Sequence, residues 1–228
     1  MASGKKTVLV LGGGGDIGRA VCARLKADGY SVEAPASSLL DLTDTNSINA
    51  YFGRKRPVYA GVVHCAGYNS PKPCAETSAE DIGRTLAVNT LGFFEVLRKV
   101  LPQMRRSGRG SIVAVSSLYG TFARPGRLPY VMSKHALNGL VKTLALELGP
   151  DDISVNAVSP GFVDTKMTRR NNSSATLKSF RAKIPLGRLA LPSDVANAVS
   201  FLLDPRARYI TGQDIVVDGG YSAGGFQE

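Results

Sequence analysis

The sequence predicts a single α/β domain built as a three-layer, doubly wound parallel sheet. Short apolar runs typical of buried strands alternate along the chain with segments of helical periodicity, the order expected of a parallel sheet with helices on both faces. The first run, Thr7 to Leu11, enters a glycine-rich turn that opens a helix. The 228 residues contain no internal repeat, linker or low-complexity tail, so one domain spanning residues 1–228 is expected.

The expected elements follow from local patterns, in chain order. Apolar runs predict strands at residues 7–11, 30–34, 60–64, 111–116, 153–158 and 215–217. Helical spacing and start signals predict helices at residues 17–29, 44–56, 130–148 and 192–203. A capping box at Thr77 to Glu80 is expected to open a long helix through Leu86 and Phe93. Residues 166–184 are polar and basic without a clear period, which predicts a mobile loop or short helices over a substrate site.

Composition argues against several classes of protein. No apolar run approaches the ~20 residues of a membrane span, and none forms a signal-peptide core, so we expect a cytoplasmic protein with no membrane partner. Three cysteines and two histidines lack the spacing of metal ligands, so reduced thiols and no metal site are expected. The net charge of +10 comes without a nucleic-acid recognition motif, so no nucleic-acid partner is expected. It indicates a solvated basic surface, or an anionic substrate, cofactor or acidic protein partner.

Tyr130 and Lys134 lie four residues apart in a segment with helical character. Side chains at this spacing share one face of a helix, which places an ammonium close to a phenol. A nearby positive charge favours the phenolate and lowers the tyrosine pKa from its usual value of about 10. Such a tyrosine can exchange a proton with an alcohol or a carbonyl. Taken alone, such a pair far more often belongs to an ordinary surface helix, so the rest of the chain must decide.

The glycine run from Gly12 to Gly18 follows the first expected strand and opens the first expected helix. Glycines at such a turn let the backbone approach a pyrophosphate closely, and the helix N-terminus stabilises that anion through its N–H groups and dipole. A glycine-rich turn by itself is a weak signal. Its position directly after the first strand favours a dinucleotide-binding site.

Further motifs follow the glycine turn in a fixed order. They are His64 to Gly67, Asn89 in Val88-Asn89-Thr90, Ser117 thirteen residues before Tyr130, Asn156 to Gly161, Ile210 to Gln213 and Val217 to Gly220. With Tyr130 and Lys134, they resemble the short-chain dehydrogenase/reductase family over almost the whole chain. The resemblance implies a Rossmann fold. It also implies an oxidoreductase that moves a hydride between a nicotinamide cofactor and a ketone or secondary alcohol.

The chain departs from the motifs of this family at four positions. Leu11 stands where a threonine is usual, and Asp16 stands where the middle glycine of the turn is usual. His64 and Cys65 replace two asparagines of the motif that flanks the adenine ribose.

The resemblance implies a role for each catalytic residue, namely Asn89, Ser117, Tyr130 and Lys134. Tyr130 would exchange the proton, and Lys134 would lower its pKa and bind the ribose hydroxyls. Ser117 would hydrogen-bond the reacting oxygen, and Asn89 would hold a water that connects Lys134 to solvent. The implied cofactor-binding residues are Gly12, Gly14, Gly15, Asp16, Ile17, Gly18, Ser37, Asp41, Leu42, Cys65, Ala66, Gly67, Asn89, Tyr130, Lys134, Pro160, Gly161, Val163 and Thr165.

The second strand bears on the choice between NADP and NAD. Family members have a helix between their second and third strands, but here Ser37-Ser38 is followed almost at once by a stretch, Leu39 to Asp44, that resembles the family's next conserved segment. We therefore expect that helix to be deleted. An acidic residue at the end of the second strand would repel a 2′-phosphate. The position falls near Ala36, where no residue is charged, and Glu33 lies too early, so NADP is expected in preference to NAD.

The substrate is less well defined. The segments 160–169 and 185–189 resemble 3-oxoacyl-(acyl-carrier-protein) reductases, which suggests a 3-oxoacyl thioester and an acidic carrier protein. The residues expected to meet that carrier near the site entrance are Arg105, Arg106, Arg109 and Arg169. A small cyclic alcohol, polyol, sugar or specialised-metabolite ketone is the alternative. Arg124 and Arg127, just before Tyr130, could hold a carboxylate or phosphate of such a substrate, or face water.

Two further expectations follow from the resemblance. A non-catalytic NAD(P)-binding sensor is disfavoured, because such members tend to lose the tyrosine or the lysine and this chain keeps both. Family members assemble through the long helices, so a homotetramer or homodimer is expected.

Overall fold

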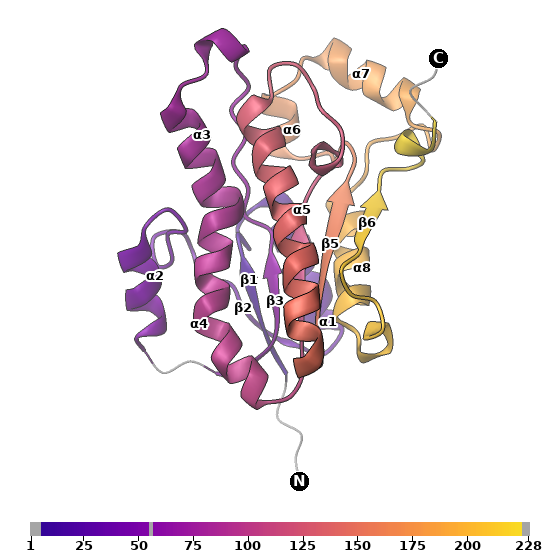
Figure 1. The fold of residues 1–228 in the computed structure, drawn as a ribbon. Coiled ribbons are helices and arrows are strands. Elements are labelled where there is room, and N and C mark those ends of the chain that lie inside the picture. Colours follow the sequence, from indigo (N-terminus) through magenta and orange to yellow (C-terminus); the bar gives the residue numbers. More distant parts are fainter. Residues whose placement is uncertain (1–5, 55–56, 225–228) are drawn as a thin grey trace.

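The sheet has six parallel strands in the order β2-β1-β3-β4-β5-β6 (Figure 1). A computed structural model describes residues 6–54 and 57–224. The strands are β1 (Thr7–Leu11), β2 (Ser31–Glu33), β3 (Tyr59–His64), β4 (Gly110–Val115), β5 (Ile153–Pro160) and β6 (Asp214–Val217). The strand order reverses between β1 and β3, and a crevice opens at the carboxyl ends of the strands at such a reversal. The doubly wound parallel fold is confirmed.

Helices cover both faces of the sheet. On one face, α1 (Asp16–Ala27) and α8 (Pro192–Leu203) bury an aliphatic cluster that includes Val21 and Val199. On the other face lie α2 (Thr45–Phe52), α4 (Gly92–Arg106) and α5 (Leu128–Leu148), which bury residues such as Phe93 and Leu137 (Figure 1). Each fully buried side chain of this size contributes about 1.5–3 kcal/mol. Within the described chain, no helix is both long and apolar enough to cross a bilayer.

The connection from β2 to α2 is short. Residues 34–44 run through turns, with no helix before Asp41, as expected for the deletion. The stretch forms no strand either, so β2 is the edge of the sheet. Helix α2 ends at Phe52, earlier than expected, and Lys55 and Arg56 at the end of the expected helix lie outside the described residues.

The long helix after β3 has three parts. These are α3 (Ala79–Leu86), a π-helical turn at Ala87–Leu91 and α4. The expected capping box is wrong by one residue: the Ser78 hydroxyl accepts from the Asp81 N–H at 3.1 Å, and Asp81 accepts from the Ser78 N–H at 3.0 Å. Ser78 caps the helix because its backbone is extended, at φ −88° and ψ 164°. Asn89 lies in the middle of this π-helical turn, and such turns concentrate at functional sites.

The expected substrate segment consists of short helices. It contains α6 (Lys166–Arg170) and α7 (Ser174–Lys183), at the same end of the molecule as the carboxyl ends of the strands (Figure 1). Phe180 of α7 stacks on Phe162 with ring centroids 3.7 Å apart, and this contact anchors the segment to the residues after β5. Of the two alternatives predicted for this segment, a mobile loop or short helices, the structure has short helices.

Candidate active site

A cavity of about 680 Å³ lies at the carboxyl ends of the strands. Of the residues predicted for the site, those that line it are Gly12, Gly14, Gly15, Asp16, Ile17, Gly18, Cys65, Ala66, Gly67, Ser117, Tyr130, Lys134, Pro160, Gly161, Val163 and Thr165. They come from the ends of four strands and from the starts of α1, α5 and α6. Segments that are far apart in the sequence therefore meet at one cavity.

The glycine turn has the close packing and the open side that a dinucleotide requires. A Cβ on Gly12, which has φ +74°, would lie 2.5 Å from the Ala66 backbone, and one on Gly18 would lie 2.2 Å from the Gly12 carbonyl. These two glycines let β1, β3 and α1 approach one another. A Cβ on Gly14 would meet nothing within 4 Å, so this side of the turn is open. An open glycine turn at the N-terminus of α1 fits a pyrophosphate.

Asp16, which replaces a glycine of the family motif, ties the turn to α6. Its Oδ2 atom accepts from the Lys166 backbone N–H at 2.7 Å, and its Oδ1 atom pairs with Arg19 at 2.5 Å. Arg19 also donates to the Gly14 carbonyl. The carboxylate is therefore compensated by Arg19, and the glycine turn is joined directly to the start of α6.

Tyr130 lies beside Ser117 at the end of β4, and its proton affinity is governed by burial. Burial raises the pKa of Tyr130 to about 12, while a hydrogen bond with Ser117 and the charge of Arg127 act in the lowering direction. The expectation that Lys134 lowers this pKa is wrong in this structure. The Lys134 ammonium donates to the Val115 carbonyl at 2.8 Å and lies 5.6 Å from the centre of the Tyr130 ring. Lys134 is only 2% exposed, and burial lowers its own pKa to about 8.

Asn89 lies behind the cavity wall and does not line it. Its Oδ1 atom accepts from the Tyr68 N–H at 2.7 Å, and its Nδ2 atom donates to the Ser133 hydroxyl at 2.8 Å and to the Tyr68 carbonyl at 3.0 Å. The amide therefore fixes the loop after β3 to α5. Its predicted contact with a water stays a prediction.

His64 occupies the position of a family asparagine and supports the same bend. Its Nε2 atom lies 3.1 Å from the Asn89 carbonyl, and its ring stacks on Phe93 with centroids 4.6 Å apart. Burial lowers the pKa of His64 to about 3, so the imidazole is neutral at physiological pH. A neutral ring that donates to a backbone carbonyl acts as a structural support for the π turn.

Three residues predicted for the adenine end do not line the cavity. Ser37 and Asp41 are exposed in the turns after β2, and the Asp41 carboxylate accepts from the Thr43 N–H and hydroxyl at 2.8 Å each. Leu42 packs against the core instead. Because the family's helix after β2 is missing, this stretch runs through turns. The Asp41 side chain therefore bonds a neighbouring residue and Leu42 packs on the core, and neither faces the cavity.

Other lining residues were not singled out from the sequence: Arg19, Tyr68, Val88, Val115, Ser116, Lys166, Met167, Thr168 and Arg170. Four of them lie in the 166–184 segment, whose position over a site was expected.

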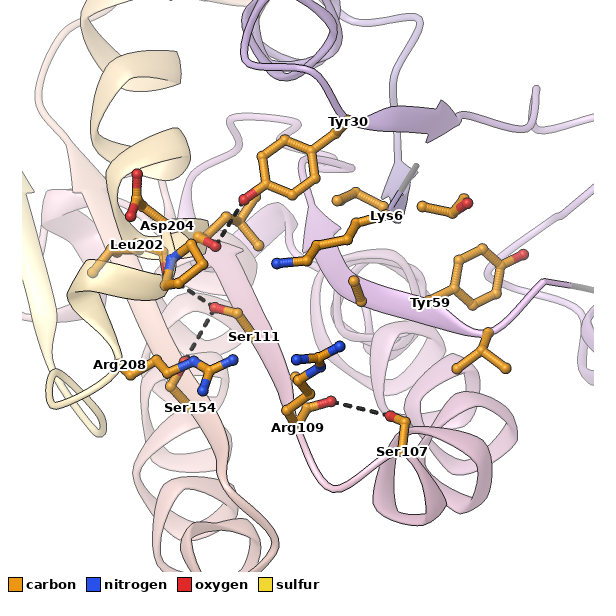
Figure 2. Close-up of a pocket in the computed structure, with 17 residues that line it drawn as sticks. Lys6, Tyr30, Tyr59, Ser107, Arg109, Ser111, Ser154, Leu202, Asp204 and Arg208 are labelled. Atoms are coloured by element: carbon orange, nitrogen blue, oxygen red, sulfur yellow. Dashed lines mark hydrogen bonds between the residues drawn. The ribbon is translucent and has the colours of Figure 1, made fainter. Parts of the chain in front are cut away.

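The arginines expected at the site entrance are mostly elsewhere. Arg105, Arg106 and Arg109 precede β4. Because the strands are parallel, these arginines lie at the end of the sheet where the strands begin, here called the amino edge, which is opposite the cavity at the carboxyl ends, the carboxyl edge. Arg109 lines a smaller pocket of about 240 Å³ at that amino edge (Figure 2). Arg105 pairs with Asp151 at 2.8 Å. Arg169 is at the expected end of the molecule but pairs with Asp164 at 2.8 Å. Among the described residues, the cationic side chains that line the cavity are those of Arg19, Lys134, Lys166 and Arg170.

Comparison with known proteins places the chain in a family. A family model described as enoyl-(acyl carrier protein) reductase matches residues 15–222. The chain is 36% identical over 223 residues to the 3-oxoacyl-(acyl-carrier-protein) reductase FabG of Aquifex aeolicus, covering 96% of this chain and 89% of the relative. It is 32% identical over 244 residues to the cyclopentanol dehydrogenase of Comamonas testosteroni, covering 96% and 97%.

A solved structure agrees with these sequence relatives. ElxO with NADP bound superposes with a TM-score of 0.86 at 28% identity, covering 96% of this chain and 99% of that one. The glycine turn, the tyrosine and lysine on one helical face and the serine after β4 line one cavity. The FabG relative matches 96% of the chain that carries them. The chain belongs to the short-chain dehydrogenase/reductase family of NAD(P)-dependent oxidoreductases.

Proposed function

We propose that the protein interconverts a ketone and a secondary alcohol with NADP(H), and that Tyr130 is the acid and base. The observation that carries the proposal is the meeting of Ser117, Tyr130 and Lys134 at one wall of the cavity that also holds the open glycine turn. When bound, the nicotinamide would supply or accept the hydride. At a pKa of about 12, the Tyr130 phenol is protonated at neutral pH, which suits proton donation to a developing alkoxide.

The other catalytic residues act on the oxygen and on the tyrosine. The Ser117 hydroxyl hydrogen-bonds the phenol and lines the cavity. It would also hydrogen-bond the substrate oxygen as charge develops there. The Lys134 ammonium is held by the Val115 carbonyl on the same wall and would bind ribose hydroxyls there. Asn89 fixes the bend behind them and would act through the position of Tyr68 and α5.

The side chains at the end of β2 support NADP. Glu33, the last residue of the strand, accepts from the Tyr51 phenol and from the Tyr59 phenol, the latter at 2.9 Å. Its carboxylate is therefore engaged with the core-facing tyrosines. Residues 34–38 carry no charge, so no acidic side chain there opposes a 2′-phosphate. The NADP bound to ElxO is consistent with this choice.

A 3-oxoacyl thioester is the proposed substrate, and the FabG relative is its main support. Within one chain, Lys166 and Arg170 at the cavity wall are the cations placed to meet an anionic carrier, whereas Arg105, Arg106 and Arg109 lie at the opposite edge. The cyclopentanol dehydrogenase relative makes a cyclic alcohol the second candidate.

A substrate screen tests the proposal. NADPH and NADH are each supplied with an acetoacetyl thioester, cyclopentanone and a panel of sugars and polyols. We expect the highest kcat/KM with NADPH and the thioester, and a steep fall with salt when the thioester is carrier-linked. Preference for NADH would overturn the cofactor assignment. Turnover of cyclopentanone alone would overturn the thioester assignment but keep the reaction class.

A further inference from the structure

Arg127 is a buried cation next to the proposed catalytic tyrosine. It precedes α5 as its N-terminal cap, three residues before Tyr130, and is only 6% exposed. Its Nη2 atom donates to the Asn171 carbonyl at 3.1 Å and to Oδ1 of Asn172 at 3.4 Å. Its Nη1 atom is buried and has no hydrogen-bond acceptor in the described part of the chain. No carboxylate from the described residues pairs with this guanidinium.

Burying a guanidinium without a paired carboxylate is energetically unfavourable. Moving a charged side chain out of water costs several kcal/mol, and two carbonyl-type acceptors offset only part of that cost. Arginine cannot escape by losing its proton, although burial lowers its pKa. The exposed arginines of this protein meet no such cost, because water solvates them. A buried guanidinium with a free donor is therefore well suited to an anionic ligand.

A second guanidinium lies in the same neighbourhood. Arg124 donates from Nη1 to the Tyr119 hydroxyl at 3.3 Å and stands 5.0 Å over the Phe180 ring of α7. The Tyr119 ring packs edge-on against Tyr130, with centroids 6.2 Å apart. The two arginines and the reacting phenol thus gather where the start of α5 meets the α6–α7 segment.

We propose that Arg127, assisted by Arg124, forms a carboxylate-binding subsite beside Tyr130, so that the enzyme accepts oxo carboxylic acids whose carboxylate lies a few bonds from the reacting carbonyl. The proposal rests on the proposed reductase function and narrows its substrate class. A guanidinium offers parallel N–H donors that match a carboxylate in two-point contact. Arg127 precedes Tyr130 by three residues at the start of α5, so a carboxylate held there would belong to the same small substrate as the reacting carbonyl.

Binding measurements test the subsite without requiring turnover. 4-Oxopentanoate and its methyl ester are titrated into the protein, alone and with NADP⁺, by isothermal titration calorimetry. We expect the acid to bind at least about tenfold more tightly than the ester, and Arg127→Gln to remove this difference. Arg127→Lys should restore part of it, because it keeps the charge but not the two-point contact. Arg98→Gln on α4, whose side chain pairs with Glu95 on the surface, is the matched control and should bind as the wild type does.

Kinetics separate the subsite from other roles of Arg127. With NADPH, Arg127→Gln should raise KM for the acid at least about tenfold and leave KM for the ester unchanged. Equal affinity for acid and ester in the wild type would overturn the proposal. So would an equal fall in kcat for both substrates with a shifted pH profile, since Arg127 would then act only through Tyr130. If the enzyme reduces acetoacetyl thioesters but does not prefer 4-oxopentanoate over its methyl ester, the carboxylate subsite is wrong and the proposed reductase function stands. If it reduces no ketone at all, the proposed function is wrong.

Discussion

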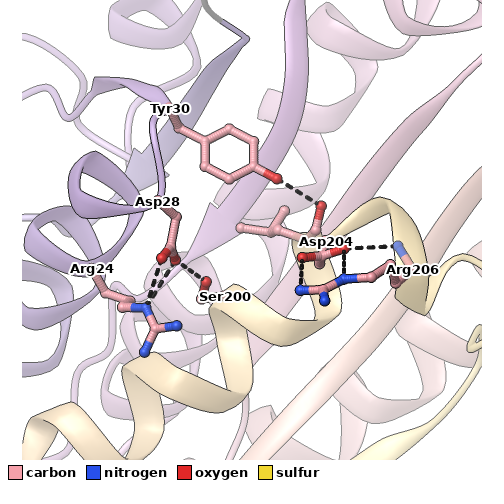
Figure 3. A network of polar contacts seen from close by, with 7 residues as sticks. Arg24, Asp28, Tyr30, Ser200, Asp204 and Arg206 are labelled. Atoms are coloured by element: carbon pink, nitrogen blue, oxygen red, sulfur yellow. Dashed lines mark hydrogen bonds and ion pairs between the residues drawn. The ribbon is translucent and has the colours of Figure 1, made fainter.

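The amino and carboxyl edges of the sheet differ in the charges that they bury. At the amino edge, Asp28 accepts from Arg24 at 2.9 Å and from the Ser200 hydroxyl, and it ties α1 to α8 (Figure 3). Nearby, Asp204 pairs with Arg206 at 2.8 Å, and the Tyr30 phenol donates to the Leu203 carbonyl at 3.0 Å (Figure 3). Charged groups there have opposite partners or face water.

The carboxyl edge buries cations without acids. Lys134 is held by a carbonyl, and Arg127 by a carbonyl and an amide oxygen. Exposed ion pairs such as those of the amino edge contribute only about 0–1 kcal/mol each. An uncompensated buried cation costs more than that. The difference teaches that the amino edge is arranged for a stable fold, while the carboxyl edge gives up stability to hold Lys134 at the cavity wall and Arg127 beside Tyr130.

Replacing Lys134 should have the largest effect, and it should change activity and stability in opposite directions. We expect Lys134→Met to lower kcat by about 10²–10⁴-fold, because the positioned ammonium is lost. The same change should stabilise the protein, because the shift of the Lys134 pKa from 10.5 to about 8 corresponds to about 3 kcal/mol of unfavourable burial, part of which is recovered. Urea unfolding at pH 7 and steady-state kinetics measure both effects. A variant that is less stable than the wild type would contradict this account of the carboxyl edge.

Two glycines with positive φ provide a second contrast. Gly12→Ala should destabilise the protein by about 3 kcal/mol or more and weaken NADPH binding, because its Cβ would overlap the Ala66 backbone at 2.5 Å. Gly29→Ala, between α1 and β2, meets nothing within 4 Å, so only the left-handed backbone at φ +89° opposes it, at about 1–2 kcal/mol. Chemical unfolding of both variants decides the point. Equal losses would show that the close approach at the glycine turn adds nothing.

The pH dependence of stability should carry the signature of Lys134. Its folded pKa of about 8 lies below the unfolded value of 10.5, so the unfolded chain binds more protons between these values. The free energy of unfolding of the wild type should therefore rise, relative to Lys134→Met, from pH 8 to about pH 10. Above about pH 10, the free energy of unfolding should fall in both proteins, because the pKa of Tyr130 is raised from 10 to about 12 in the folded state. A flat difference between the two proteins across this window would refute the burial of a charged Lys134.

The smallest effect is expected at the amino edge. Asp28→Asn should cost about 1 kcal/mol or less, because the pair with Arg24 is partly solvated, and kcat/KM should stay within twofold of the wild type. Thermal unfolding and the reductase assay measure these values. A loss of activity as large as that of Lys134→Met would mean that the two edges are not independent.

The sequence was sufficient for the order of elements and for most of the cavity wall. Apolar runs and helical spacing report backbone patterns that packing then preserves, as in β5 and α8. The family motifs placed Ser117, Tyr130 and Lys134 on the wall because their positions depend on the ends of strands and on one helical face.

Features set by three-dimensional packing escaped prediction. The pKa of Tyr130 depends on burial, which no spacing along the chain reveals, and it moved opposite to the expected direction. The burial of Arg127 depends on how the α6–α7 segment closes over the start of α5. The misplaced Arg109 is different, since the direction of β4 alone would have assigned it to the amino edge.

The central claim is that Tyr130 transfers the proton at the carboxyl edge, and Tyr130→Phe tests it most directly. The phenyl ring keeps the packing against Tyr119, while the hydroxyl that Ser117 contacts is lost. The measurement is NADPH binding by fluorescence together with kcat for an NADPH-dependent ketone reduction. We predict that the dissociation constant for NADPH changes less than about threefold, while kcat falls by about 10³-fold or more. Turnover at the wild-type rate in this variant would contradict the account.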